Sequence, residues 1–229
     1  MKVTYLEHSG FAAEYKEYVL IFDWYRGSLP EFDPQKKIYV FASHSHYDHF
    51  NKKIFGWSEQ YPDVRYILSA DIAGKEQSER TAYVTANKKY DFDGIKVQTL
   101  HSTDEGVAFI VYMEDKVIYH AGDLNWWHWE EETESYNEQM RQDYQREIDK
   151  LKDIVIDIAF VPLDPRQENQ YAWGMDYFMK HTHTKYVFPM HMWGDYEVYD
   201  RLMENPEAEP YKERVIKVKE PGQVFEVNV

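Results

Sequence analysis

The stretch that most constrains this chain is residues 40–50, with the sequence VFASHSHYDHF. Four side chains that can bind a metal ion, His44, His46, Asp48 and His49, lie within it. Neutral imidazole and carboxylate are ligands that Zn²⁺ and related divalent ions accept. The apolar run 38–42 predicts a buried strand, so these side chains would follow its carboxyl end. We expect His44 and His46 to bind one ion and Asp48 and His49 another, because so short a segment cannot easily close on one ion. The alternative, a solvated histidine-rich loop, is disfavoured by the preceding strand.

The same residue types recur where other predicted strands end. The apolar runs 95–100 and 116–120 are followed closely by His101 and Asp123, and the run 185–188 is followed by His191. A polar residue at one strand end is common. Ligand chemistry at several strand ends indicates one rim of a sheet that is built into a site.

Periodicity and turn residues predict a strand-rich chain with helices in both halves. The strongest hairpin signal is Asp93-Gly94, between two predicted strand segments. Strands are expected near residues 3–6, 11–15, 18–22, 38–42, 64–68, 82–85, 95–100, 107–113, 116–120, 154–161, 185–188, 215–218 and 224–227. Helices are expected near residues 51–60, 71–80, 130–153, 171–181 and 196–203. This distribution favours two sheets packed face to face with helices outside.

The hexapeptide HSHYDH at 44–49 resembles the H-x-H-x-D-H signature of the metallo-β-lactamase superfamily. The resemblance covers nearly the whole chain. It implies a mixed α/β fold, a four-layer αββα sandwich, as a single domain over residues 1–229.

The resemblance also implies the remaining metal ligands. The family has a histidine after a strand, matched by His101, an aspartate in a Gly-Asp pair, matched by Asp123, and a histidine ending a later strand, matched by His191. One ion would then be held by His44, His46 and His101. The other would be held by Asp48, His49 and His191, with Asp123 touching both.

Several residues near this set have more than one interpretation. If His101 does not bind, Ser102 and Asp104 are the alternatives beside it. Asp23 could orient a metal-bound histidine through its ring N–H or be an ordinary turn aspartate, and the resemblance favours the first. For His8, in the turn after the first strand, a structural role is favoured over a role in the site. The resemblance makes the two interpretations more nearly equal. Structural or surface roles are the default for His120, His128, His181 and His183.

The ligand chemistry points to catalysis. Structural zinc closes all four positions with protein ligands, mostly thiolates, whereas imidazole and carboxylate ligands here leave room for water. Two ions sharing a hydroxide would lower its pKa and polarise a carbonyl or phosphoryl oxygen. We therefore expect a hydrolase with Asp48 and Asp123 as catalytic residues, Asp48 also moving a proton. Zinc is the expected metal, with manganese or iron as alternatives.

The substrate is expected to be a small ester, lactone or phosphoester. Trp126 and His128 belong to an aromatic segment that could wall a pocket or simply pack under a helix. Arg166 could pair with a substrate anion or form a surface ion pair. Trp193 follows His191 closely and would lie near the second ion. The segments 8–10, 102–106 and 122–125 resemble the lactonase-like branch of the family, related to ascorbate phosphate lactonase.

Composition excludes several partners and compartments. The net charge of −15 argues against nucleic acid and anionic membranes, although a metal pair can reverse the potential locally for a small anion. There is no cysteine, hence no disulfide and no thiolate ligand. The N-terminus lacks the apolar core of a signal peptide and no apolar run approaches the roughly 20 residues of a membrane span, so a cytoplasmic protein is expected. A homo-oligomer is possible because an aromatic-rich surface could form an interface.

Two other functions stay open from the sequence. One is an oxidoreductase that uses an iron pair at similar ligands, and the other is a metal-binding module without catalysis. Iron content and redox activity would identify the first. Metal loading without any turnover would identify the second.

Overall fold

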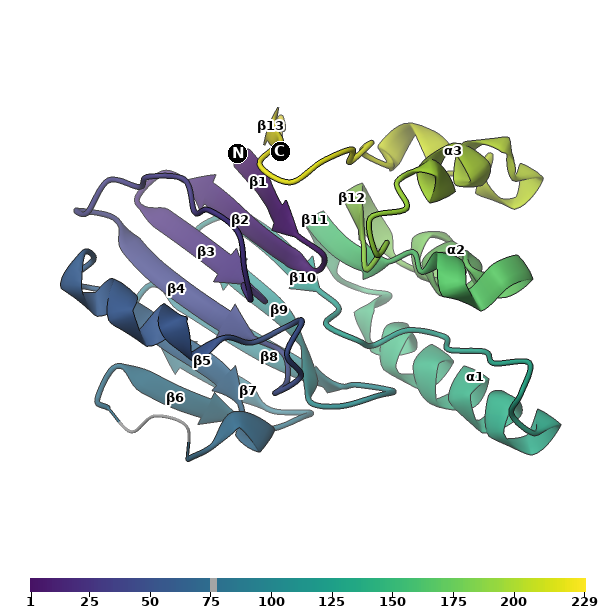
Figure 1. Ribbon diagram of the computed structural model, residues 1–229, viewed down its shortest axis with the longest axis horizontal. Helices are drawn as coiled ribbons and strands as arrows, with labels where there is room; N and C mark the ends of the chain where they lie inside the picture. The colour runs from purple at the N-terminus through teal and green to yellow at the C-terminus, as the bar shows by residue number, and fades with distance from the viewer. Residues whose placement is uncertain (75–77) are drawn as a thin grey trace.

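Two β-sheets face each other in the computed structural model, which describes residues 1–74 and 78–229 (Figure 1). Within these residues, the first sheet has the order β13-β1-β2-β3-β4-β5-β6. Its strands are β1 (Lys2–Glu7), β2 (Gly10–Tyr15), β3 (Tyr18–Phe22), β4 (Lys37–Ala42), β5 (Arg65–Ser69), β6 (Thr81–Val84) and β13 (Val224–Glu226). The second sheet has the order β12-β11-β10-β9-β8-β7. Its strands are β7 (Lys89–Phe92), β8 (Ile95–His101), β9 (Val107–Met113), β10 (Lys116–His120), β11 (Val155–Pro162) and β12 (His183–Met190).

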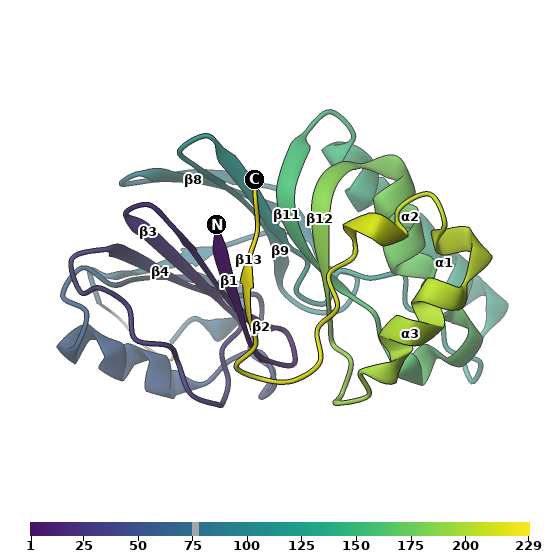
Figure 2. The ribbon, with the colours of Figure 1, turned by 90° about the horizontal axis from the view of Figure 1, so that it is seen from above.

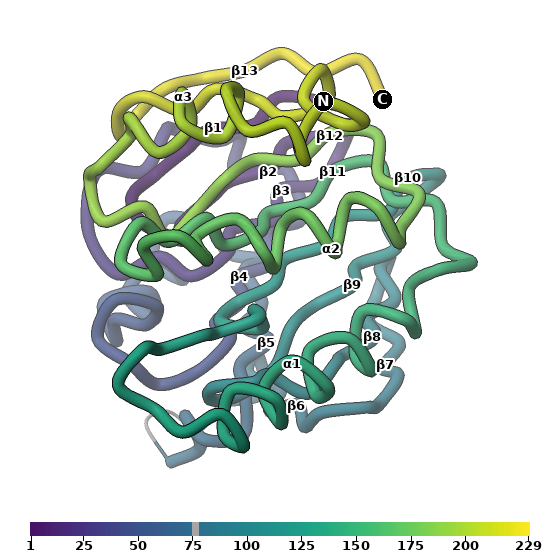
Figure 3. The backbone as a smooth tube through the Cα atoms, turned by 90° about the vertical axis from the view of Figure 1, so that its right-hand side faces the viewer, coloured from purple at the N-terminus to yellow at the C-terminus, as the bar shows by residue number. Residues whose placement is uncertain are grey.

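The helices lie outside the two sheets. The α-helices are α1 (Glu134–Ile148), α2 (Trp173–His181) and α3 (Glu197–Glu204), and they gather beside the second sheet (Figures 2 and 3). The 3₁₀ helices are η1 (Lys52–Glu59), η2 (Ala70–Ile72), η3 (Asp149–Leu151), η4 (Pro165–Gln170), η5 (Pro206–Ala208) and η6 (Lys212–Arg214). Since η1 covers the outer face of the first sheet, the layers are helix, sheet, sheet and helix (Figure 1). This is the predicted αββα sandwich.

Aromatic side chains fill the space between the sheets. Phe11 of β2 stacks on Phe160 of β11 with ring centroids 4.3 Å apart, and Phe41 of β4 meets Phe109 of β9 at 5.1 Å. Strand residues on the opposite face are also apolar and buried, for example Ile21, which belongs to a second core under η1. Strands buried on both faces read as continuous apolar runs, which is why the sequence located them so clearly.

Parallel pairing brings several strand ends to one edge of the molecule. The strands β3, β4 and β5 run parallel in the first sheet, and β10, β11 and β12 do so in the second. The register places Phe22 beside Phe41, and Met190 beside Pro162. The loops that follow these strands therefore start at the same level, and they carry the metal-binding motif and most of the other candidate ligands.

Three expected elements differ from the structure. The helix predicted at 71–80 is reduced to η2, because the chain turns at Gly74, whose φ of +89° is left-handed; residues 75–77 of that prediction lie outside the described residues. The strand predicted at 215–218 is only a bridge from Val215 to Val187, because η6 precedes it at once. The helix predicted from 130 begins at Glu134, where the Thr133 hydroxyl accepts a hydrogen bond from the Tyr136 N–H.

The hairpin predicted at Asp93-Gly94 is confirmed. The Asp93-Gly94 turn joins β7 and β8 in a hairpin, and Gly94 has the positive φ of +91° that such a turn requires. Within the described residues, no helix combines the length and apolar character needed to cross a membrane. The N-terminus lies beside the final strand, since the Met1 ammonium group donates a hydrogen bond to the Val227 carbonyl at 2.8 Å (Figure 3).

Candidate metal centre

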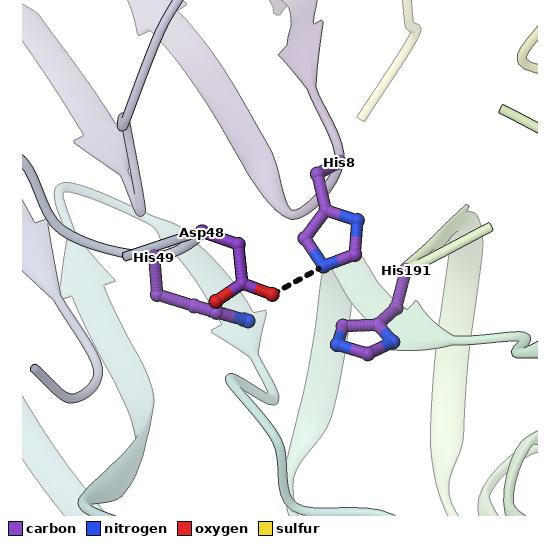
Figure 4. A group of neighbouring side chains, drawn as sticks. All are labelled: His8, Asp48, His49 and His191. Carbon is purple, nitrogen blue, oxygen red and sulfur yellow. Dashed lines mark ion pairs between the residues drawn. The ribbon is translucent and has the colours of Figure 1, made fainter. Parts of the chain in front are cut away.

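Two groups of metal-ligating side chains meet at this edge of the described structure. The first group is His8, Asp48, His49 and His191, whose ligand atoms lie within 4.8 Å of one another (Figure 4). The second group, His44, His46 and Asp123, meets the same limit. The first group draws on the β1–β2 turn, the loop after β4 and the loop after β12. Residues far apart in the chain therefore form one centre, which we call the metal centre.

Asp123 lies between the two groups. Its Oδ2 atom is 3.5 Å from His44 Nε2, while its Oδ1 atom is 3.1 Å from His49 Nε2 and 3.4 Å from His191 Nε2. The two carboxylate oxygens thus face different groups, which is the geometry a bridging ligand needs.

Hydrogen bonds set the ring orientation of the buried histidines. His49 Nδ1 lies 2.8 Å from Asp23 Oδ2, and His191 Nδ1 lies 2.9 Å from Asp164 Oδ2. An ionised carboxylate only accepts hydrogen bonds, so each Nδ1 carries a proton and each Nε2 is the ring atom left to bind a metal ion. Both Nε2 atoms point toward Asp123 and the centre. Carboxylate–histidine pairs of this kind orient metal ligands.

Asp23 also contacts His44, indirectly, through the Ser43 hydroxyl. The Ser43 hydroxyl donates to Asp23 Oδ2 at 2.6 Å, and His44 Nδ1 lies 3.0 Å from the same hydroxyl. Because the hydroxyl proton is directed at Asp23, the oxygen is free to accept from His44 Nδ1–H. One buried aspartate therefore holds His49 directly and His44 indirectly. The interpretation of Asp23 as an orienting carboxylate agrees with this geometry.

The donor set fits divalent ions. The Nε2 atoms of His8, His44 and His49 and the Oδ1 atom of Asp123 are buried and make no hydrogen bond. Buried polar atoms are nearly always satisfied, so four such atoms converging on one place require a binding partner. Imidazole nitrogen with carboxylate oxygen is the chemistry that zinc, manganese and iron accept.

The electrostatics favour the metal-binding form of most of these ligands; for His49, however, the effect of burial is outweighed by the carboxylates of Asp123 and Asp23, which raise its pKa well above the usual value. Burial lowers the pKa of His8 and of His44 to about 4, so both rings are neutral at pH 7. Burial opposes ionisation of Asp48, but the neighbouring rings of His8 and His49 lower its pKa to about 2. Burial likewise opposes ionisation of Asp123, yet the surrounding histidines hold its pKa well below the usual range.

Two glycines allow the loops to approach. A Cβ atom on Gly106 would lie 1.9 Å from the Ser43 carbonyl oxygen, and one on Gly122 would lie 2.6 Å from Ser43 Cβ. Neither contact is possible, so these positions need glycine for the loops after β8 and β10 to pack on the metal-binding motif.

His8, Asp23 and His191 adopt positive φ values of 53°, 44° and 63°, a backbone conformation that non-glycine residues hold mainly where surrounding contacts impose it.

His101 is not brought to the metal centre. Its side chain is exposed and belongs to neither group of ligand atoms in the described residues, so the prediction of His101 as a ligand is not supported. Its backbone N–H donates to Glu147 of α1 at 3.1 Å. Leu100 and Ser102 on either side are buried, and because side chains alternate along a strand, His101 points the other way. Asp104, one of the two alternatives, lines the same pocket as Asp123.

A pocket of about 220 Å³ opens beside Asp123 and His191. Its other walls are Thr103, Asp104, Trp127, Trp129, Tyr136, Met140 and Arg166. Burial and the negative charge of Asp123 raise the pKa of the Asp104 carboxyl. We call this space the substrate pocket.

The predicted substrate residues are divided between two places. Arg166 lines the substrate pocket, and the Trp193 ring lies 4.5 Å from the ring of His8 and is 43% exposed. Trp126 and His128 instead line a separate, larger pocket of about 540 Å³ together with Trp173 and glutamates of α1 and the segment before it. These two would touch only a substrate that extends beyond the substrate pocket.

The sequence analysis did not place His8 in the metal centre or Asp164 beside it. A structural role was favoured for His8, yet its Nε2 atom lies 3.5 Å from Asp48 Oδ2 within the first group (Figure 4). Asp164 was named only as part of a loop. A signal existed for both, since each follows a predicted strand, as Asp23 and His191 do.

His120 takes the expected structural role: its Nδ1 accepts from the Gly122 N–H, which places Nε2–H toward the Ser9 carbonyl at 2.8 Å.

Comparisons with known proteins agree with this architecture. Residues 2–138 match the family model of the beta-lactamase superfamily domain. A UPF0173 metal-dependent hydrolase of Desulforamulus reducens is 30% identical over 141 residues, which cover 54% of this chain and 62% of that protein. The UPF0173 metal-dependent hydrolase YtkL of Bacillus subtilis is 29% identical over 143 residues, 54% of this chain and 63% of that protein. The chain thus matches less than two thirds of the length of these curated relatives.

Solved structures share the whole fold. Igni18, a metallo hydrolase of Ignicoccus hospitalis, superposes with a TM-score of 0.67 at 16% identity and covers 99% of each chain. The metallo-beta-lactamase fold protein YhfI of Bacillus subtilis gives 0.65 at 13% identity and covers 98% of each. At these identities the likeness concerns the fold alone.

Proposed function

Because this chain belongs to the beta-lactamase superfamily, we propose that it is a metal-dependent hydrolase with two divalent ions. The observation that carries the proposal is Asp123, whose two oxygens face two separate groups of ligand atoms. The names of the curated relatives, metal-dependent hydrolases, support the same activity.

Each ion has its own set of ligands in this proposal. His44 and His46 would hold one ion and Asp48, His49 and His191 the other, with Asp123 shared between them. His8 would complete the second set, and Asp104 is the candidate for the position that was expected for His101. When bound, two ions activate water as a nucleophile near neutral pH and polarise a carbonyl or phosphoryl oxygen. Zinc and manganese both suit this donor set.

The residues of the chain have defined tasks around these ions. Asp23 and Asp164 hold the rings of His49 and His191 in the orientation that directs Nε2 inward. Asp48 is ionised and can accept a proton from an attacking water. The indole rings of Trp127 and Trp129 line one side of the substrate pocket and limit its size.

The proposed substrate is a small ester, lactone or phosphoester. A pocket of about 220 Å³ is below the usual size range for drug-like ligands, so a compact molecule fits it best. Arg166 is the one arginine or lysine among the residues that line it, which favours a substrate with a carboxylate or phosphate group. The local likeness to lactonase-like sequences at 8–10, 102–106 and 122–125 supports a cyclic ester. A nucleic acid partner is disfavoured by the charge of −15.

Metal content per chain tests the proposal directly. Elemental mass spectrometry of the purified protein should find close to two equivalents of zinc or manganese, and the His46→Ala variant should retain about one. Two equivalents of iron would indicate redox chemistry instead. Absence of bound metal after repletion would refute the proposal. Metal without turnover on a panel of lactones, esters and phosphoesters would indicate a binding module.

A further inference from the structure

Arg166 lies next to the carboxylate that orients a metal ligand. Its Nε atom donates to both oxygens of Asp164 at 3.0 Å, and its Nη2 atom donates to Asp164 Oδ2 as well. The same Oδ2 atom receives His191 Nδ1–H at 2.9 Å. Arg166, Asp164 and His191 therefore form a continuous chain of charged hydrogen bonds that ends at the metal centre.

Aromatic rings hold the guanidinium in place. Its central carbon lies 4.5 Å from the centre of the Trp193 ring and 5.8 Å from that of Trp129. The Trp193 indole N–H also donates to Asp164 Oδ2, at 3.3 Å. A planar guanidinium can stack on such rings and bond a carboxylate through two N–H groups at once, which an ammonium group cannot do.

The two orienting carboxylates differ in how their charge is balanced. Asp164 has no exposed surface, but its negative charge meets the guanidinium of Arg166, whose side chain is 48% exposed. The Asp23 carboxylate is equally buried and, among the described residues, pairs with histidines and Ser43 and not with a guanidinium. A buried carboxylate that loses its charged partner pays a desolvation cost, so Asp164 depends on Arg166 as Asp23 does not.

We propose that Arg166 is a positioning residue for the metal centre, which holds Asp164 aligned on His191 and thereby strengthens binding of the ion at His8, Asp48, His49 and His191. This inference rests on the proposed function, since it assumes that this group binds an ion. It adds to the proposed substrate-binding role of Arg166, because Nε and Nη2 serve Asp164 while Nη1 makes no hydrogen bond within the described part of the chain. One guanidinium then supports the metal ligand on one edge and can meet a substrate anion with the other.

The test isolates one ion at a time with Co²⁺ as the probe. In a His46→Ala background, which keeps the His191 group, Arg166→Met should weaken Co²⁺ binding by about tenfold, the lower end of what partners of metal ligands contribute. Arg166→Lys should fall in between, because lysine keeps the charge but not the two-point bond. In an Asp48→Ala background, which keeps the His44, His46 and Asp123 group, Arg166→Met should leave Co²⁺ binding within about twofold.

Arg201 provides the matched control. It stacks on Tyr171 at 4.0 Å and donates to the Glu168 carbonyl at 2.8 Å, so it also combines ring stacking with a hydrogen bond, but neither partner is a candidate metal ligand. Arg201→Met should not change Co²⁺ binding in either background. Circular dichroism of the metal-free variants checks the fold, and Arg166→Lys decides the matter if Arg166→Met does not fold.

The outcomes separate the two proposals. Unchanged Co²⁺ affinity in the His46→Ala background after Arg166→Met or Arg166→Lys would overturn the positioning role alone. Equal weakening in both backgrounds would overturn it too, since that result reflects a general structural effect. Failure of the parent protein to bind Co²⁺ at all would overturn the proposed function itself.

Discussion

Replacing Asp23 with asparagine should weaken the binding of both ions proposed for the metal centre. Asp23 is fully buried and accepts three hydrogen bonds, from the Ser43 N–H at 2.7 Å, the Ser43 hydroxyl at 2.6 Å and His49 Nδ1 at 2.8 Å. Its φ of 44° is left-handed, a conformation that asparagine tolerates and alanine does not. Asp23→Asn therefore removes the charge and one acceptor without adding backbone strain.

The magnitude follows from the contacts that are lost. Asparagine has one oxygen in place of two, so its amide N–H₂ must face either Ser43 or His49, both of which are donors in this arrangement. Loss of the carboxylate partner of a metal-bound histidine costs about 10–100-fold in metal affinity, or roughly 1.4–2.7 kcal/mol. The buried donor left without an acceptor should also lower the free energy of unfolding by about 1–3 kcal/mol.

Competition titration of Zn²⁺ against a chromogenic chelator measures the effect on each ion. Ser43→Ala is the matched control, because it cuts the link from Asp23 to His44 and leaves the direct bond to His49. We expect Asp23→Asn to weaken both ions and Ser43→Ala to weaken only the ion at His44. If Asp23→Asn lowers the unfolding free energy yet leaves both Zn²⁺ affinities unchanged, Asp23 is a structural residue and the orienting role is wrong.

Four further predictions follow from the same geometry. Asp123→Ala should lose at least one metal equivalent by elemental mass spectrometry, and retention of both ions would contradict its bridging position. His101→Ala should keep both ions, in contrast to His46→Ala, because the His101 side chain points to solvent. Arg166→Ala, assayed at saturating metal, should raise KM for anionic substrates much more than for neutral ones; equal losses would leave it only the positioning role. Burial lowers the pKa of His8 from 6.5 to about 4. Between these pH values the unfolded chain binds a proton at His8 and the folded chain does not, so the free energy of unfolding of the metal-free protein should fall by up to about 3 kcal/mol as pH falls from 6.5 to 4. The free energy of unfolding, measured by chemical denaturation across this pH range, should therefore decline more steeply for the parent than for His8→Gln. Parallel curves of unfolding free energy against pH would contradict the buried, neutral state of His8.

The local features of this protein were readable from its sequence. The residues 44–49 carry their chemistry within a single loop, and the apolar run before them is long enough to be a buried strand in any context. Asp123 and His191 were predicted from the resemblance and from their position after apolar runs. The parallel pairing of β10, β11 and β12 then aligns those strand ends, which is why the two side chains lie at the same edge.

The predictions of secondary structure were wrong where a single backbone angle or the presence of a partner strand decides whether a helix or strand forms. Gly74 ends the helical segment predicted at 71–80, and periodicity does not reveal whether a glycine adopts a left-handed angle. Val215 has the composition of a strand residue but pairs with β12 at one bridge only. Strand formation depends on a partner in register, which local composition does not specify.

Tertiary structure alone decided which polar residues reach the metal centre. His101 follows the same kind of apolar run as His191, but side chains alternate along a strand, so a one-residue difference in phase turns its ring to solvent. His8 joins Asp48 from a turn forty residues earlier because β1 and β2 form a hairpin at the same edge. The pairing of Asp164 with His191 depends on the register between β11 and β12. The sequence by itself determined the candidate ligand chemistry and most of the strands. Phase and register, which arise only when distant strands pair, determined which candidate ligands lie together and which carboxylates contact them.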